Sequence, residues 1–154
     1  MRASSYRLEE LVPHRDPMRL IDEIVSYDND NREIVASLIV REQWRCAESA
    51  IEYMAQSAAA LAGLNDKAEF GDDFAPRPGF LLGTRKLILP GTNFNPGEKL
   101  FVRAKDVFSD RNQASFECEV YRENALNEKE VLATARLNAY RPDDIKDFIT
   151  ESRN

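Results

Sequence analysis

CAESAIEYMAQSAAALAGL, the stretch from Cys46 to Leu64, predicts a long buried α-helix at the centre of the fold. Its apolar residues recur at steps of three and four, a spacing that gathers side chains into one stripe on a helix. They are Ala47, Ala50, Ile51, Met54, Ala58, Leu61 and Ala62, and Gly63 is a candidate for the end of the helix. Alanine at this density lets other backbone approach closely, and most of the surrounding chain has strand character. We therefore predict a helix wrapped by a sheet.

Six segments outside this helix have the composition of β-strands. They run from Met18 to Tyr27, Glu33 to Val40, Phe80 to Leu89, Lys99 to Phe108, Gln113 to Arg122 and Glu130 to Tyr140. The fifth alternates, with Phe116 and Cys118 on one face and Glu117 on the other, which is typical of a strand with one wet side. Short turns separate the last four segments, which favours a consecutive antiparallel meander. The predicted fold class is α+β, an antiparallel sheet whose apolar face the helix covers.

The remaining segments fit a single domain. A chain of 154 residues is long enough for one real core and too short for two domains of ordinary size. We expect one domain over residues 1–154, with a core from about 11 to 141. Short helices are expected near the two ends, at residues 1–12 and 143–150, and a long loop is expected from Asn65 to Pro78.

The charge of the chain limits its partners. It carries 21 basic and 27 acidic residues, a net charge of −6, which argues against nucleic acid and anionic membrane as main partners. Neither a signal peptide nor an apolar run long enough to span a bilayer is evident, so we expect a cytoplasmic protein. Cys46 and Cys118 lack metal-ligand spacing and lie on apolar stripes, so both are expected to be reduced and structural, although a disulfide between them stays open. We expect no metal and no cofactor.

Two polar residues of the predicted helix, Glu52 and Gln56, lie four apart and therefore on one face. The ordinary interpretation is a capping box, in which Glu52 bonds the backbone N–H of Ser49 at the start of the helix. The alternative is a general acid or base at a partly desolvated site. The spacing fits both interpretations.

Three motifs carry a family resemblance. Pro13–Met18 (PHRDPM), followed by Leu20–Ile24 (LIDEI), is similar to a family's Pro-His-Arg-Tyr-Pro-Phe and Leu-Val-Asp-Arg-Val. Glu52–Gln56 (EYMAQ) is similar to its Glu-Ala-Met-Ala-Gln on a central helix. Gly79–Gly83 (GFLLG) stands where its third strand presents a backbone N–H to a thioester carbonyl. From Leu11 to Tyr140 the chain thus resembles the hotdog-fold dehydratases of 3-hydroxyacyl chains on acyl carrier protein.

One segment departs from that family. Its Gly-His-Phe-Pro-Gly motif, which carries the catalytic histidine, would fall within Ile39–Cys46, where the chain has no histidine. The pattern is closer to a divergent branch, the dehydratases of aryl-polyene-type lipid gene clusters, which pair a Pro-His segment with the helix glutamate. That branch is associated with hetero-oligomers that contain a second hotdog subunit. The resemblance therefore implies either a homodimer or a hetero-oligomer of this kind.

The resemblance implies specific roles for four residues. Dehydration needs a base for the C2 proton, an acid for the C3 hydroxyl and donors for the thioester oxygen. Glu52 is expected to be the acid, and His14, the single histidine of the chain, is the candidate base. The N–H of Gly83 would be the donor, while Gln56 would orient Glu52 or a water, or else bond loop backbone. For His14 the alternative is a residue that packs or caps the turn between two prolines.

Two rival functions and one docking surface complete the predictions. A hotdog thioesterase would use Glu52 to activate water without needing His14, and a non-catalytic subunit would keep the fold while its partner supplies the chemistry. An acidic chain that binds an acidic carrier protein needs a local positive patch. Arg77, Arg85 and Lys86 are candidates for it, and the alternative for Arg85 or Lys86 taken singly is an ordinary solvated strand end.

Overall fold

The computed structural model describes residues 19–71, 80–110 and 112–140. Along the chain these form β1 (Glu23–Asp28), β2 (Glu33–Ile39), the 3₁₀ turn η1 (Glu42–Trp44), α2 (Ser49–Phe70), β3 (Phe80–Ile88), β4 (Lys99–Ser109), β5 (Gln113–Glu123) and β6 (Lys129–Tyr140). All six predicted strands are present. The helices predicted at residues 1–12 and 143–150 lie outside the described residues.

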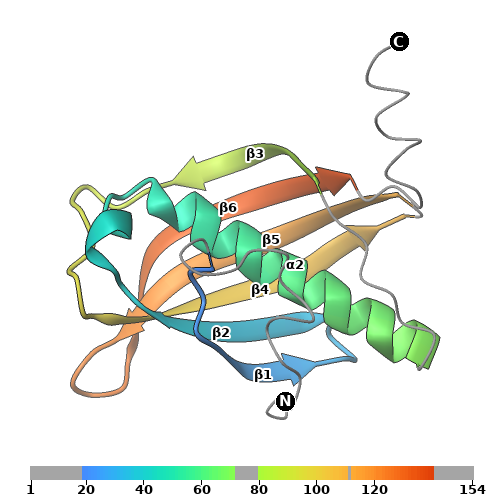
Figure 1. Ribbon diagram of the computed structural model, residues 1–154, viewed down its shortest axis with the longest axis horizontal. Coiled ribbons are helices and arrows are strands. Elements are labelled where there is room, and N and C mark those ends of the chain that lie inside the picture. The colour runs from blue at the N-terminus through green and yellow to red at the C-terminus, as the bar shows by residue number, and fades with distance from the viewer. Residues whose placement is uncertain (1–18, 72–79, 111, 141–154) are drawn as a thin grey trace.

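The six strands form one antiparallel sheet in the order β1-β2-β4-β5-β6-β3. It curves around α2, which lies along one face (Figure 1). The predicted hotdog architecture is therefore confirmed. The predicted meander of the last four strands is wrong in one respect, because β3 pairs with β6 and not with β4. The β1–β2 hairpin occupies the other side of β4, so β3 closes the far edge of the sheet.

Strand alternation determines which side chains meet the helix. In β5 the side chains of Ala114, Phe116, Cys118 and Val120 are buried, whereas Glu117 between them is exposed. The same alternation in β4 buries Leu100, Val102 and Ala104. One face of the sheet thus forms the core with α2, and the opposite face, called here the outer face, carries the polar side chains.

The helix is longer than predicted. Gly63 does not end it, because α2 continues to Phe70 and keeps Leu64, Asn65 and Asp66 buried. Burial of the residues that precede and follow Gly63 outweighs the penalty of roughly 1 kcal/mol for glycine inside a helix. The predicted loop from Asn65 is therefore helical in its first part, and residues 72–79 lie outside the described residues. The helix ends at Gly71, which has φ +61° and donates its N–H to the Lys67 carbonyl.

The helix end provides a test of backbone strain. Gly71→Ala should lower the free energy of unfolding by about 1–3 kcal/mol, because φ +61° with ψ −130° is a region that side chains disfavour. An added Cβ meets no atom within 4 Å there, so steric overlap makes no contribution. Gly91→Ala is the matched control, with open space and no positive φ. Urea denaturation should show Gly91→Ala to be neutral or slightly stabilising; equal losses in both variants would contradict the prediction.

Candidate active site

Glu52 and Gln56 are joined by a hydrogen bond on the first two turns of α2. The Nε2 group of Gln56 donates to Oε1 of Glu52 at 3.1 Å. The Oε1 atom of Gln56 accepts the backbone N–H of Leu20 at 2.8 Å. The Gln56 amide therefore contacts both the Glu52 carboxylate and the backbone just before β1, while its role in orienting Glu52 for catalysis stays a prediction.

Burial makes this amide a rigid positioning group. Gln56 is 1% exposed and Leu20 is 2% exposed, so their hydrogen bond is shielded from water. The Leu20 N–H can only donate, so it requires the amide oxygen and directs the NH₂ group of Gln56 toward Glu52. Glu52 is half-buried. The arrangement presents one carboxylate, held by a buried donor, at the start of the central helix.

The capping-box interpretation of Glu52 is wrong. The residue before the helix is Glu48, and it has helical dihedrals without a side-chain capping bond. Ser49 is already inside the first turn, and its N–H donates to the Cys46 carbonyl at 2.9 Å. The backbone turn therefore satisfies the group that the box would have used.

Tyr53, next to Glu52, anchors the start of the helix, a role that the sequence pattern did not predict. Its hydroxyl donates to the Trp44 carbonyl at 2.5 Å, and its ring packs against Phe94 with centroids 5.7 Å apart. Tyr53 is fully buried, and burial raises the pKa of its phenol to about 12. The phenol therefore stays neutral and acts as a structural donor. Its position corresponds to an alanine of the family motif, which is the signal that could have identified it.

Gly83 lies on β3, an edge strand of the sheet. It pairs with Asn138 of β6, and the register shifts by one residue between Leu81 and Gly83. An added Cβ at Gly83 would meet no atom within 4 Å, so the chain itself does not require glycine there. The helix packs mainly over β4, with further contacts to β5, β2 and β6.

Arg85 and Lys86 follow Gly83 on β3, and both are exposed. Arg85 pairs with Arg136, and a second register shift lies between Arg85 and Ile88. Lys86, inside this irregularity, has φ +52°. The two cations are therefore presented by a distorted edge strand rather than by a regular one.

The remaining predicted residues have varied outcomes. His14 and Arg77 lie outside the described residues, so their roles stay predictions. Both cysteines are free. Cys118 is buried, which raises the pKa of its thiol to about 12 and leaves it inert. Cys46 is exposed beside Ser49 and does not belong to the apolar stripe of the helix, contrary to the prediction.

Comparison with known families identifies the chain. Residues 6–150 match the model of the ApeP-like family, described as ApeP dehydratase. The chain belongs to the ApeP-like family. This confirms the expectation of a dehydratase, a hydro-lyase of the branch linked to aryl-polyene biosynthesis. A comparison with curated proteins gives no match.

Solved structures support the fold of this ApeP-like protein. The ApeI:P dehydratase heterocomplex from Xenorhabdus doucetiae matches with a TM-score of 0.79 at 24% identity, covering 98% of this chain and 100% of that chain. The PaaI protein of the E. coli phenylacetic acid degradation operon matches with a TM-score of 0.55 at 12% identity, covering 78% of each chain. A Streptococcus mutans protein, smu.793, bound to acetyl CoA, matches with a TM-score of 0.54 at 13% identity, covering 84% of this chain and 96% of that chain.

Across the described part of the chain, no helix combines the length and apolarity that crossing a bilayer requires.

The buried amide of Gln56 can be tested by its effect on stability. Gln56→Leu leaves the buried Leu20 N–H without its acceptor, so the free energy of unfolding should fall by about 1–3 kcal/mol. Gln43→Leu, the same exchange at an exposed position of η1, is the matched control and should change stability by no more than about 0.5 kcal/mol. Urea denaturation measures both. A Gln56→Leu protein as stable as its control would contradict the positioning role.

Proposed function

We propose that this ApeP-like dehydratase eliminates water from a 3-hydroxyacyl thioester carried on acyl carrier protein, with Glu52 as the general acid. The observation that supports it best is the contact of Glu52 with the buried Gln56 amide, which holds the carboxylate in one orientation. An exposed carboxylate would have to be ordered by the substrate itself. Holding it beforehand lowers the barrier to proton transfer.

The chemistry divides between three groups. A base takes the proton from C2, and the electron pair moves toward the thioester carbonyl as the C3–O bond breaks. Glu52 gives a proton to the departing hydroxyl, which leaves as water. The N–H of Gly83 is proposed to donate to the thioester oxygen as negative charge develops on it. His14 is the proposed base.

The helix packs over β4, β5, β2 and β6, whereas β3 lies at the edge of the sheet, and this arrangement favours an assembly. Gly83 lies on an edge strand, and an edge strand can pair with the strand of another subunit. We infer a dimer, or a hetero-oligomer with a second hotdog protein, in which a neighbouring helix approaches β3. The Xenorhabdus doucetiae structure of similar fold is a dehydratase heterocomplex, which supports the second form. The free thiols are consistent with a cytoplasmic location.

A thioesterase remains the second candidate. Acyl-CoA hydrolases occur among the solved structures of similar fold, but at 11% identity they share only the architecture. Glu52 could activate water in such an enzyme. The products separate the two functions, because dehydration gives an enoyl thioester that absorbs light, whereas hydrolysis releases a thiol.

Glu52→Gln tests the proposed acid. The amide keeps the shape of the side chain and can still accept the bond from Gln56, so folding stability should change little. It cannot supply the proton, so turnover of a 3-hydroxyacyl carrier protein should fall by roughly a hundredfold or more. Enoyl absorbance measures the rate. Activity retained by Glu52→Gln would exclude Glu52 as the acid.

His14→Ala tests the proposed base in the assembled complex. Loss of roughly a hundredfold in elimination is expected if His14 takes the C2 proton. The control is the substitution of a histidine in the second hotdog subunit by alanine. If elimination survives both Glu52→Gln and His14→Ala but is lost with the partner's histidine, this chain is a supporting subunit.

A further inference from the structure

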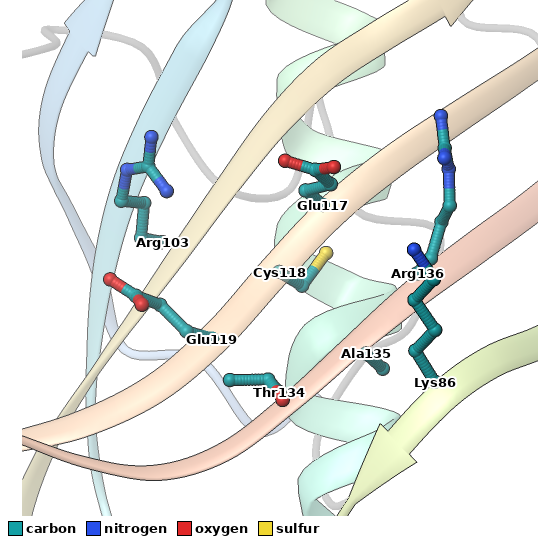
Figure 2. Close-up of a pocket in the computed structure, with 8 residues that line it drawn as sticks. All are labelled: Lys86, Arg103, Glu117, Cys118, Glu119, Thr134, Ala135 and Arg136. Atoms are coloured by element: carbon teal, nitrogen blue, oxygen red, sulfur yellow. The ribbon is translucent and has the colours of Figure 1, made fainter.

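An open groove of about 240 Å³ lies on the outer face of the sheet, away from α2 (Figure 2). Its charged side chains project from strands whose alternate residues, such as Cys118 and Ala135, are buried toward the helix. The groove is lined by Lys86, Arg103, Glu117, Cys118, Glu119, Thr134, Ala135 and Arg136. It is thus a surface distinct from the face that carries Glu52.

Lys86 and Arg136 line the β3 side of this groove, and Arg85 lies next to them in the sheet. Arg85 pairs directly with Arg136 across the β3–β6 ladder, and paired residues on antiparallel strands point to the same face. Lys86, the neighbour of Arg85 in sequence, lines the groove together with Arg136 (Figure 2). In a regular strand, neighbours point to opposite faces. The register shift between Arg85 and Ile88, with Lys86 at φ +52°, therefore places two consecutive cations on the outer face.

Within the described residues, Arg85, Lys86 and Arg136 form no ion pair, whereas two other charged residues of the groove do. Arg103 pairs with Glu33, and Glu119 pairs with Lys129. Arg85, Lys86 and Arg136 make no such pair in the described part of the chain. Glu117 lies opposite Arg136 in the register, so one carboxylate borders three cations. The edge formed by β6 and β3 is locally positive on a chain of net charge −6.

We propose that Arg85, Lys86 and Arg136 form the docking site for a carboxylate-bearing surface of the acyl carrier protein. This assignment rests on the proposed function. Like-charge repulsion from the rest of this acidic chain directs an acidic protein to the place where unpaired cations are exposed. Guanidinium groups pair with carboxylates in a bidentate geometry. The carboxylates of Glu117 and Glu119 in the same groove disfavour a compact phosphate dianion. A protein surface, in contrast, can contact the cations at the rim with spaced carboxylates.

The site also lies close to the proposed thioester contact. Gly83 is two residues from Arg85 on the same strand. A carrier bound at this cluster would therefore hold its thioester arm close to the proposed thioester contact. The position of the cluster thus gives β3 two tasks, which are separated by two residues along the strand.

Arg136→Gln is the principal test, because Arg136 both lines the groove and pairs with Arg85 across the β3–β6 ladder. Lys86→Asn is the second variant, since asparagine tolerates positive φ and removes the charge without adding strain. Lys105→Gln is the matched control, with the same loss of charge on the outer face of β4, opposite Glu117. For Arg136→Gln and Lys86→Asn, kcat/KM on a 3-hydroxyacyl carrier protein should fall about tenfold at low salt. The difference in kcat/KM between each of these variants and the unmodified protein should shrink in about 1 M salt.

A carrier-free thioester of a short pantetheine analogue separates docking from chemistry. Arg136→Gln should leave its dehydration unchanged, and direct titration with fluorescent carrier protein should show weaker binding. Equal losses on both substrates, or an equal loss in Lys105→Gln, would overturn the docking site. A selective loss on the coenzyme A thioester, with carrier protein unaffected, would assign the cluster to phosphate and overturn it as well.

Failure of the proposed function is distinguishable. If the unmodified complex dehydrates neither thioester, the proposed reaction is wrong, and the binding titration alone then decides the docking. Weaker carrier binding by Arg136→Gln and Lys86→Asn, with Lys105→Gln unaffected, would support it. Unchanged binding would overturn it.

Discussion

Close contact between the alanine side chains of α2 and the inner face of the sheet is the constraint on which the rest of the structure depends. Ala50, Ala58 and Ala60 are at most 5% exposed, and the residues that meet the helix from β4 include Val102 and Ala104 at 0%. Small side chains on both surfaces let the strands curve around the helix. Larger side chains would hold the backbones apart and leave gaps, which cost packing energy. The wrapped sheet and the buried Gln56 both require this close approach.

Local patterns predicted most of the strands. In Gln113–Arg122 the alternation of apolar and charged residues depends on the strand itself, and the observed β5 differs from it by one residue. The pairing of β3 was wrong because strand order is a non-local property. The connection from β3 to β4 crosses from the edge of the sheet to a strand beside β2. Short turn length alone suggests, in contrast, that consecutive strands are neighbours. That pairing also explains why Arg136 was missed, since its neighbour Arg85 is about fifty residues away along the chain.

The candidate site was predictable in part for the same reason. The spacing of Glu52 and Gln56 predicted a shared helix face, and the structure joins them by a hydrogen bond. The partner that makes Gln56 a positioning group, the Leu20 N–H, comes from a segment that the helix meets only after folding. Likewise, Gly63 has the local character of a helix end, but burial of Leu64 and Asn65 extends the helix past it. Where local sequence signals are ambiguous, tertiary contacts thus determine the structure that forms.

Strand β3 combines features that a merely structural edge strand would not need. It has two register shifts within nine residues, one beside Gly83 and one around Lys86. Each shift gives up regular ladder bonds and exposes backbone, and Lys86 also adopts a disfavoured positive φ. Such irregularities occur preferentially at sheet edges and next to functional sites, where they redirect side chains. In β3 the consequence is specific, because a Cβ at Gly83 would meet no atom within 4 Å and the second shift lies beside two adjacent cations. The strand therefore carries both the proposed thioester contact and the proposed carrier site.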